Sequence, residues 1–148
     1  MPTTPFSGVY PCYQNQFKAG AAGGQSEPTT VIADCETFQV AINGNMVEYS
    51  PFEAEGWLKR KLTGKDIVIT VTAKRNIGDT GQDLIAACAF KTMGDAELDF
   101  AWNFPDGTSV WFKNAVINVT NLGGGSARDL GPLEFTVNSN GKPTITPA

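Results

Sequence analysis

The stretch that most constrains the fold is residues 96–121, AELDFAWNFPDGTSVWFKNAVINVTN. Its first half has a period of two, typical of a strand with one buried and one exposed face. The expected buried phase is Leu98, Phe100, Trp102 and Phe104, and the expected exposed phase is Glu97, Asp99, Ala101 and Asn103. The tripeptide Pro105-Asp106-Gly107 supplies a turn, so the sequence predicts a long β-hairpin. In the second half the apolar phase slips near Lys113-Asn114, which indicates a β-bulge.

Alternating segments on both sides of this hairpin extend the strand pattern. Residues 65–75 alternate inward-facing and outward-facing side chains, many of them β-branched. Residues 31–42 predict a further strand, after which Asn43-Gly44 predicts a tight turn and residues 46–49 the returning strand. A last strand is expected over residues 133–137. The chain is therefore expected to be mainly β, as an antiparallel β-sandwich or barrel.

One segment departs from the strand period and predicts a short helix at about residues 79–90. Asp79 can serve as its N-cap, and Gln82 stands three residues later, in the capping-box position. The apolar stripe of this helix consists of Leu84, Ile85 and Cys88. A single short helix among several strands is expected to flank one face of the sheet.

With 148 residues, of which 41% are hydrophobic and 18% charged, the chain is long enough for one globular domain. We expect that domain to span residues 31–148. Residues 1–30 show no regular period and are expected to form an N-terminal arm or extended loop. Their aromatic side chains need a surface to bury against, and a neighbouring subunit would provide one. No apolar run approaches the ~20 residues of a membrane span, so no membrane partner is expected.

The composition excludes several kinds of catalysis. Histidine is absent from the sequence, which excludes Ser-His-Asp and Cys-His catalysis and His-ligated zinc. Cys12, Cys35 and Cys88 show no CxxC spacing and are expected to be reduced and largely buried. A net charge of −4 disfavours a surface that grips nucleic acid. No catalytic, cofactor-binding or metal-binding residues are predicted, and the chain is not expected to be an enzyme.

Two patterns leave other functions open. Asp95, Glu97 and Asp99 would share one face of a strand, as the carboxylates of a glycosidase or a calcium site do, although a solvated acidic face has the same pattern. Trp57 and Trp111 could stack on sugars. The main alternative function is therefore a monomeric β-sandwich binding module for carbohydrate on a virion or cell surface, with a carboxylate-dependent hydrolase as the weaker one.

Residues 51–64, PFEAEGWLKRKLTG, depart from strand patterning and carry both charge signs. The segment is expected to be either a solvated loop or a polar contact between subunits. The residues expected at such a contact are Glu53, Glu55, Trp57, Lys59, Arg60 and Lys61.

The order of features along residues 57–143 is more informative than any one of them. A basic loop with Trp57 leads to the 65–75 strand and then to the helix after Gly78-Asp79. The motifs that follow are PDG at 105–107, GGG at 123–125 and NGKP at 140–143. This collinear set resembles the major tail (tail tube) proteins of long-tailed bacteriophages, which are related to the tube proteins of phage-tail-like systems. Residues 1–30 carry none of the resemblance.

The resemblance implies a self-assembling structural subunit, without cofactors, that forms hexameric rings stacked into a tube for genome passage. It implies further copies of the chain as partners, together with tape measure, tail initiator or distal tail, and tail terminator proteins. DNA would pass without specific binding. The implied location is the virion tail, assembled in the host cytoplasm. Glu97 and Asp99 are predicted at the lumen face, where negative charge would repel DNA phosphates. The 51–64 loop is predicted to contact neighbouring rings.

Overall fold

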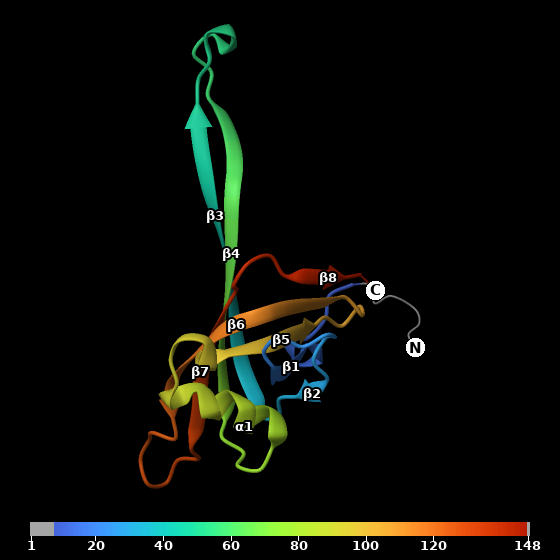
Figure 1. The fold of residues 1–148 in the computed structure, drawn as a ribbon, viewed down its shortest axis with the longest axis vertical. Coiled ribbons are helices and arrows are strands. Elements are labelled where there is room, and N and C mark those ends of the chain that lie inside the picture. The colour runs from blue at the N-terminus through green and yellow to red at the C-terminus, as the bar shows by residue number, and fades with distance from the viewer. Residues whose placement is uncertain (1–7, 148) are drawn as a thin grey trace.

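The computed structural model describes residues 8–147, and about half of these residues belong to one antiparallel sheet (Figure 1). The strands are β1 (Gln16–Ala21), β2 (Thr30–Val31), β3 (Cys35–Tyr49), β4 (Lys59–Lys74), β5 (Glu97–Asn103), β6 (Ser109–Leu122), β7 (Pro132–Asn138) and β8 (Thr144–Thr146). Their order across the sheet is β2-β1-β5-β6-β7-β4-β3, and β8 pairs with the start of β6. The expectation of a mainly β fold with one short helix is confirmed.

The central hairpin is formed as the alternation predicts. β5 and β6 pair through the turn at Pro105-Asp106-Gly107, and the core-facing rings of Phe100 and Phe112 lie directly opposite each other. The register shifts between Leu98 and Phe100, and Asn114 on the facing strand has a φ of 52°. The β-bulge expected near Lys113-Asn114 is therefore confirmed, because two residues of β6 oppose one residue of β5 there.

The core lies between the inner faces of the strands and the helix α1 (Thr80–Ala87). The inward side chains of β4 from Ile69 to Ala73 and those of β7 are almost completely buried, as the alternation of both segments predicts. Asp79 caps α1 by accepting a hydrogen bond of 3.1 Å from the backbone N–H of Gln82, which confirms the predicted N-cap. Ile85 and Cys88 direct their side chains from this helical region into the core.

The turn expected at Asn43-Gly44 is wrong. β3 passes straight through these residues, and Gly44 pairs with Lys65 on β4. The chain reverses only at residues 50–58, around the short 3-10 helix Phe52–Ala54. A turn at 43–44 would leave residues 59–64 without a partner strand, whereas the longer hairpin pairs their backbone groups. The expectation that all of 51–64 departs from strand structure is corrected accordingly.

The assignment of residues 1–30 to an arm or extended loop is also wrong for part of that segment. β1 pairs with β5 over its whole length, and Phe17 is buried in the core beside Phe100. Pairing with β5 satisfies the backbone groups of β1 and gives Phe17 the apolar surroundings that an aromatic ring needs. Residues 1–7 of the expected arm lie outside the described residues.

The outer half of the β3–β4 hairpin projects far beyond the rest of the molecule (Figure 1). β7 pairs with β4 only from Val68 to Lys74, so the part of the hairpin nearer its tip has only its own two strands. No helix within residues 8–147 is long and apolar enough to cross a lipid bilayer.

Candidate self-association surface

The core-facing side of the β3–β4 hairpin still carries apolar side chains after it leaves the body, with Lys65 opposite Gly44 between them. Phe38 and Val40 pack against the core, and the same face of β3 continues outward through Ile42 and Met46. Leu62 lies opposite Met46 on β4. Ile42 is 62% exposed and Met46 55% exposed, so the row of core side chains extends into solvent. Such an exposed apolar continuation is typical of a surface that another protein surface covers.

The tip of the hairpin presents aromatic side chains on a locally ordered turn. The hydroxyl of Ser50 donates to the carbonyl of Trp57 at 3.2 Å, and the N–H of Trp57 donates to the carbonyl of Ala54 at 2.9 Å. Glu55 adopts a φ of 53°, which closes the turn. The side chain of Trp57 is 79% exposed and that of Phe52 is fully exposed. The backbone of the tip is thus satisfied internally, and its aromatic side chains remain available for contact.

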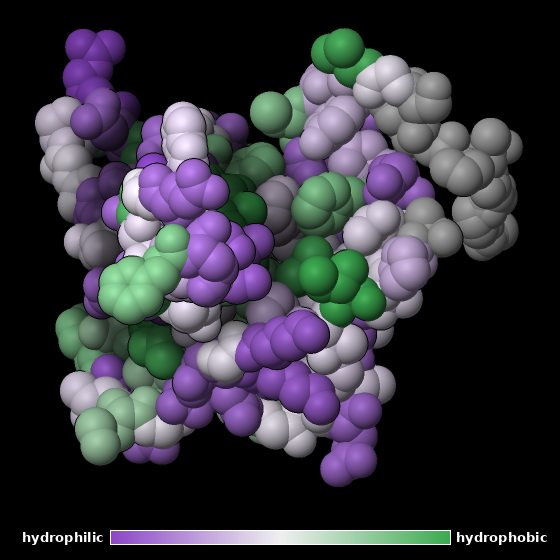
Figure 2. All heavy atoms as spheres, turned by 90° about the horizontal axis from the view of Figure 1, so that it is seen from above, coloured by the Kyte–Doolittle hydropathy of each residue, from purple (hydrophilic) through white to green (hydrophobic). Residues whose placement is uncertain are grey.

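The structure gathers the six residues expected at an inter-subunit contact in one place, the tip and the adjoining end of β4. Glu53, Glu55 and Trp57 lie in the loop, and Lys59, Arg60 and Lys61 begin β4. Arg60 is held by an ion pair of 2.8 Å with Glu48 on β3. Lys59 and Lys61 lie opposite Tyr49 and Val47, on the other face of the hairpin. Seen from above in Figure 2, hydrophobic and hydrophilic side chains lie side by side at this end.

The two carboxylates predicted for the lumen face have different environments. Glu97 is partly exposed, whereas Asp99 is 1% exposed, so its expected place on a solvated face is wrong. Asp99 does project from the side of β5 opposite the core. The segment 22–29 covers that side, because Gly24 donates to Asp99 and Ser109 on β6 donates to Glu27. A buried carboxylate cannot line a channel.

The sheet has a long open edge. β3 is the last strand on its side of the sheet order, and within the described residues it pairs only with β4. At the opposite end of the order, β2 has only two residues. An unpaired edge of this length presents a row of backbone donors and acceptors that another strand can satisfy.

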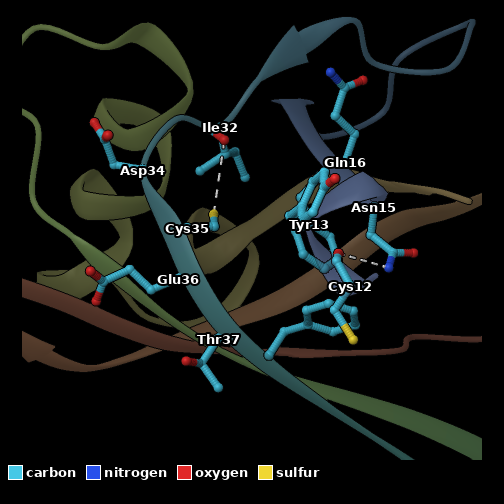
Figure 3. A pocket seen from close by; sticks show the side chains of 11 residues that line it. Cys12, Tyr13, Asn15, Gln16, Ile32, Asp34, Cys35, Glu36 and Thr37 are labelled. Atoms are coloured by element: carbon cyan, nitrogen blue, oxygen red, sulfur yellow. Dashed lines mark hydrogen bonds between the residues drawn. The ribbon is translucent and has the colours of Figure 1, made fainter. Parts of the chain in front are cut away.

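A pocket of about 350 Å³ lies between the start of β1 and the start of β3 (Figure 3). Burial, followed by the charges of Asp34 and Asp79, raises the pKa of the Cys35 thiol to about 11, so this thiol stays protonated near neutral pH. Cys12 is exposed, which corrects the expectation that all three thiols are buried, and both cysteines are free. The described residues contain no cluster of three or more His, Cys, Asp or Glu suited to a metal ion.

The two tryptophans considered for sugar stacking do not form a common platform. Trp57 lies at the hairpin tip, whereas Trp111 lies on β6 in the body, next to β8. The indole N–H of Trp111 donates to Asp99 at 3.3 Å, and the Lys113 ammonium lies 4.6 Å from the centroid of its ring. Trp111 thus serves contacts within the chain.

The fold has clear likenesses among solved structures. No protein-family model and no curated protein matches the chain. A chain from the tail of an empty gene transfer agent particle, determined with C6 symmetry, matches with a TM-score of 0.65 and 20% identity, over 93% of this chain and 99% of that chain. The tube-terminating cap of the anti-feeding prophage matches with a TM-score of 0.62 and 14% identity, over 99% and 97% respectively.

A chain of the sheath–tube complex of an extracellular contractile injection system matches with a TM-score of 0.60 and 15% identity, over 95% of this chain and 93% of that chain. At these identities the likeness shows a shared fold. The resemblance to tail tube proteins expected from the sequence is therefore confirmed at the level of the fold, which is the fold of chains from phage-like tails and injection-system tubes.

Proposed function

We propose that the chain is a structural subunit of a tail tube and that it self-assembles into stacked hexameric rings enclosing a channel for the genome. The observation that carries this proposal is the projecting β3–β4 hairpin, whose apolar side continues the core row into solvent on a fold shared with tail chains. A monomer would leave Ile42, Met46 and Leu62 exposed. A neighbouring copy would cover them.

Ring closure would use the open sheet edge. Each subunit has an unpaired β3 edge, so copies arranged around an axis would place this edge against the next subunit. When a contact joins two different surfaces of identical copies, the copies form a closed ring if the rotation from one copy to the next is a whole fraction of a full turn. A closed ring of this kind removes the open edges that would otherwise promote irregular aggregation.

Stacking of rings would use the hairpin tip. Glu53, Glu55, Trp57, Lys59, Arg60 and Lys61 lie at the end of the longest projection, which makes them our proposed inter-ring or inter-subunit contacts. Phe52 and Trp57 would supply the apolar anchors, and the charged side chains would form the polar rim. The opposite end of the molecule also exposes large apolar side chains, with Ile77 and Leu130 on adjacent loops.

The proposal also names partners and a location. The tube would begin on a tail initiator or distal tail protein, enclose a tape measure protein and end at a tail terminator, inside a virion tail assembled in the host cytoplasm. Two of the matching solved structures are a tube-terminating cap and a sheath/tube terminator, which supports a terminator partner. DNA would pass through the channel without specific binding, in keeping with the net charge of −4.

Electron microscopy of the purified chain across a concentration series tests the proposal. We expect rings or hollow tubes with six-fold end views. The double variant Phe52→Ser/Trp57→Ser should abolish tubes and keep the wild-type free energy of unfolding, because both side chains are exposed in the monomer. The matched control is Phe90→Ser/Met93→Ser, which removes two equally exposed apolar side chains elsewhere and should leave tubes intact.

Two outcomes would contradict the proposal. The first is a chain that stays monomeric at its highest soluble concentration even when purified tail tips are added as initiators. The second is equal tube formation by the wild-type protein and the tip variant. That result would reject the proposed stacking contact at the tip but not the proposed ring.

A further inference from the structure

One face of the sheet, formed by β3, β4, β7 and the second half of β6, carries hydroxyl and amide side chains in direct register. Its central row runs across all four strands as Gln39, Thr70, Thr136 and Asn118. The row on one side is Thr37, Thr72, Glu134 and Asn121, and the row on the other side is Ala41, Val68, Asn138 and Val116. We call these three rows the hydroxyl–amide face.

The hydroxyl–amide face lies opposite the core. Its residues alternate along each strand with buried core residues, for example Thr70 between Ile69 and Val71. The covering segment 22–29 reaches the outer side of β5 and the first part of β6, as its contacts with Asp99 and Ser109 show. The contacts recorded within the described residues place no other segment over the hydroxyl–amide face, and each of its side chains is at least partly exposed.

Charge is nearly absent from this face although the chain has 11 basic and 15 acidic residues. Glu134 is the one charged residue in the three rows, and the side-chain amide of Asn121 donates to it at 3.2 Å. Other charged side chains stand at the rim of the face: Glu97 opposite Val116, Asp66 one row beyond Val68, and the ion pair of Lys74 with Glu36 beyond Thr72. Exposed protein surfaces commonly carry charged side chains of both signs at about a quarter to a third of positions, so the three rows at the middle of this side of the sheet are unusually neutral.

Several polar groups of the face bond to the sheet itself. The Thr136 hydroxyl donates to the carbonyl of Asn118 at 3.5 Å, and the Asn138 amide donates to the carbonyl of Val116 at 3.3 Å. The Asn138 amide also lies 3.4 Å from the hydroxyl of Thr136. Such side chains lie along the strands instead of projecting outward. The side chains of this face therefore project little from the sheet, are polar and include no large apolar anchor. These properties make it a poor protein-binding surface.

We propose that the hydroxyl–amide face lines the channel of the tube, an inference that rests on the proposed function. Basic side chains on the channel wall would bind DNA phosphates, with an affinity that falls steeply with salt. Many acidic side chains would repel DNA and oppose its entry. Neutral hydroxyl and amide groups hold a water layer and neither attract nor repel the DNA phosphates. Transit is then insensitive to ionic strength, and Glu97, Asp66 and the Lys74–Glu36 pair act only at the rim.

Cysteine labelling of assembled tubes tests the location of the face. Thr70→Cys is made in a Cys12→Ser background, which removes the exposed native thiol. The probes are a small fluorescent maleimide and a polyethylene-glycol maleimide too large to enter the channel. In unassembled protein both should label Thr70→Cys. In tubes we expect the small probe to label it and the large probe to fail.

The control position is Lys91→Cys, on an exposed residue that follows the helical region and lies away from the hydroxyl–amide face. Labelling of Thr70→Cys by the large probe at the rate of the control would put the face on the outside of the tube. Labelling by neither probe would put it in a subunit contact, and either result overturns the inference. If the Cys12→Ser parent forms no tubes while wild type does, Cys12→Ala replaces it. If wild type forms none, the proposed function fails and the inference fails with it.

Neutrality is tested by adding charge. Tubes of Thr70→Lys/Thr136→Lys should retain a fluorescent DNA oligonucleotide at low salt and release it at high salt, whereas wild-type tubes should retain none. The double variant places two cations side by side in the central row. Salt-dependent retention by wild-type tubes would contradict a neutral wall.

Discussion

The backbone N–H of Gly24 donates a hydrogen bond of 3.1 Å to the carboxylate of Asp99 and so fastens the segment 22–29 to the bulge of the central hairpin. The same carboxylate accepts a hydrogen bond of 3.0 Å from the N–H of Asn114 and one of 3.3 Å from the indole of Trp111. Asp99 takes part in none of the ion pairs found in residues 8–147. Three N–H donors thus replace the water that burial removes.

Replacement of Asp99 should destabilise the fold. Asp99→Ala leaves three partly buried donors, one from the segment 22–29 and two from β6, without an acceptor, so we expect the free energy of unfolding of the unassembled chain to fall by about 3 kcal/mol. Urea denaturation measures this change. Glu97→Ala is the matched control, because Glu97 is a partly exposed carboxylate on the same strand, and it should cost less than about 0.5 kcal/mol. Equal losses in the two variants would contradict a special role for Asp99.

The misplacement of Asp99 shows where sequence reasoning stops. The alternation of β5 correctly predicts that Asp99 projects away from the core, because side-chain direction is a local property of a strand. Its burial depends on Gly24, which is 75 positions away in the sequence. The N-cap Asp79 and the bulge at Asn114 were predicted correctly, because both have signals in the neighbouring sequence. The cover over Asp99 was not predicted, because it comes from a distant segment of the chain.

Gln82 connects α1 to two neighbouring segments. Its side-chain amide donates to the carbonyls of Ala33 at 2.7 Å and Lys74 at 2.6 Å, and its side-chain oxygen accepts from the N–H of Asn76 at 2.6 Å. The capping-box position indicated a bond back to Asp79, but the fully buried side chain turns to these backbone groups instead. Gln82 therefore holds the connection between β4 and α1 in place.

Loss of this side chain should be costly. We expect Gln82→Ala to lower the free energy of unfolding by about 3 kcal/mol, because three partly buried backbone groups lose their partner. The adjacent helix position gives the control: Asp83, whose side chain is 46% exposed, forms an ion pair with Arg75, and Asp83→Ala should cost about 1 kcal/mol or less. Thermal and urea unfolding of both variants would test the difference, and a smaller loss for Gln82→Ala than for Asp83→Ala would refute it.

The β3–β4 hairpin shows a second limit of local patterns. Asn43-Gly44 has the composition of a two-residue turn, yet residues 59–64 are available as a partner strand, and continued pairing satisfies more backbone groups than an early turn would. The candidate contact residues from Glu53 to Lys61 lie together at the tip, and their role as a contact stays a prediction. Their position at the end of a long projection depends on the lengths of β3 and β4, which the local sequence pattern did not predict.

Gly81 lies where α1 crosses the chain before β3. A Cβ at this position would collide with the carbonyl oxygen of Val31 and the Cα of Ile32, both backbone atoms that cannot rotate away. Alanine normally stabilises a helix relative to glycine by about 1 kcal/mol, but here we expect Gly81→Ala to destabilise the fold by about 2–3 kcal/mol. Gly94→Ala meets no atom within 4 Å and serves as the control. A stability gain for Gly81→Ala would show that the helix can shift freely.

The last prediction concerns alkaline pH and Cys35. Burial is the largest cause that raises the pKa of this thiol from its usual 9.0 to about 11, followed by the charges of Asp34 and Asp79. The folded chain therefore holds the thiol proton more tightly than the unfolded chain does. This contribution to stability is complete below pH 9 and is lost as the pH rises from 9 to 11.

Urea denaturation between pH 8 and about pH 11 measures this loss. Over that window the free energy of unfolding of the wild type should fall more steeply than that of Cys35→Ala, because only the wild type carries the buried thiol. Cys12→Ala should keep the wild-type slope, since Cys12 is exposed. Parallel curves for the wild type and Cys35→Ala would mean that the Cys35 thiolate is as well solvated in the folded chain as in the unfolded one. The start of β3 would then have to open readily to water.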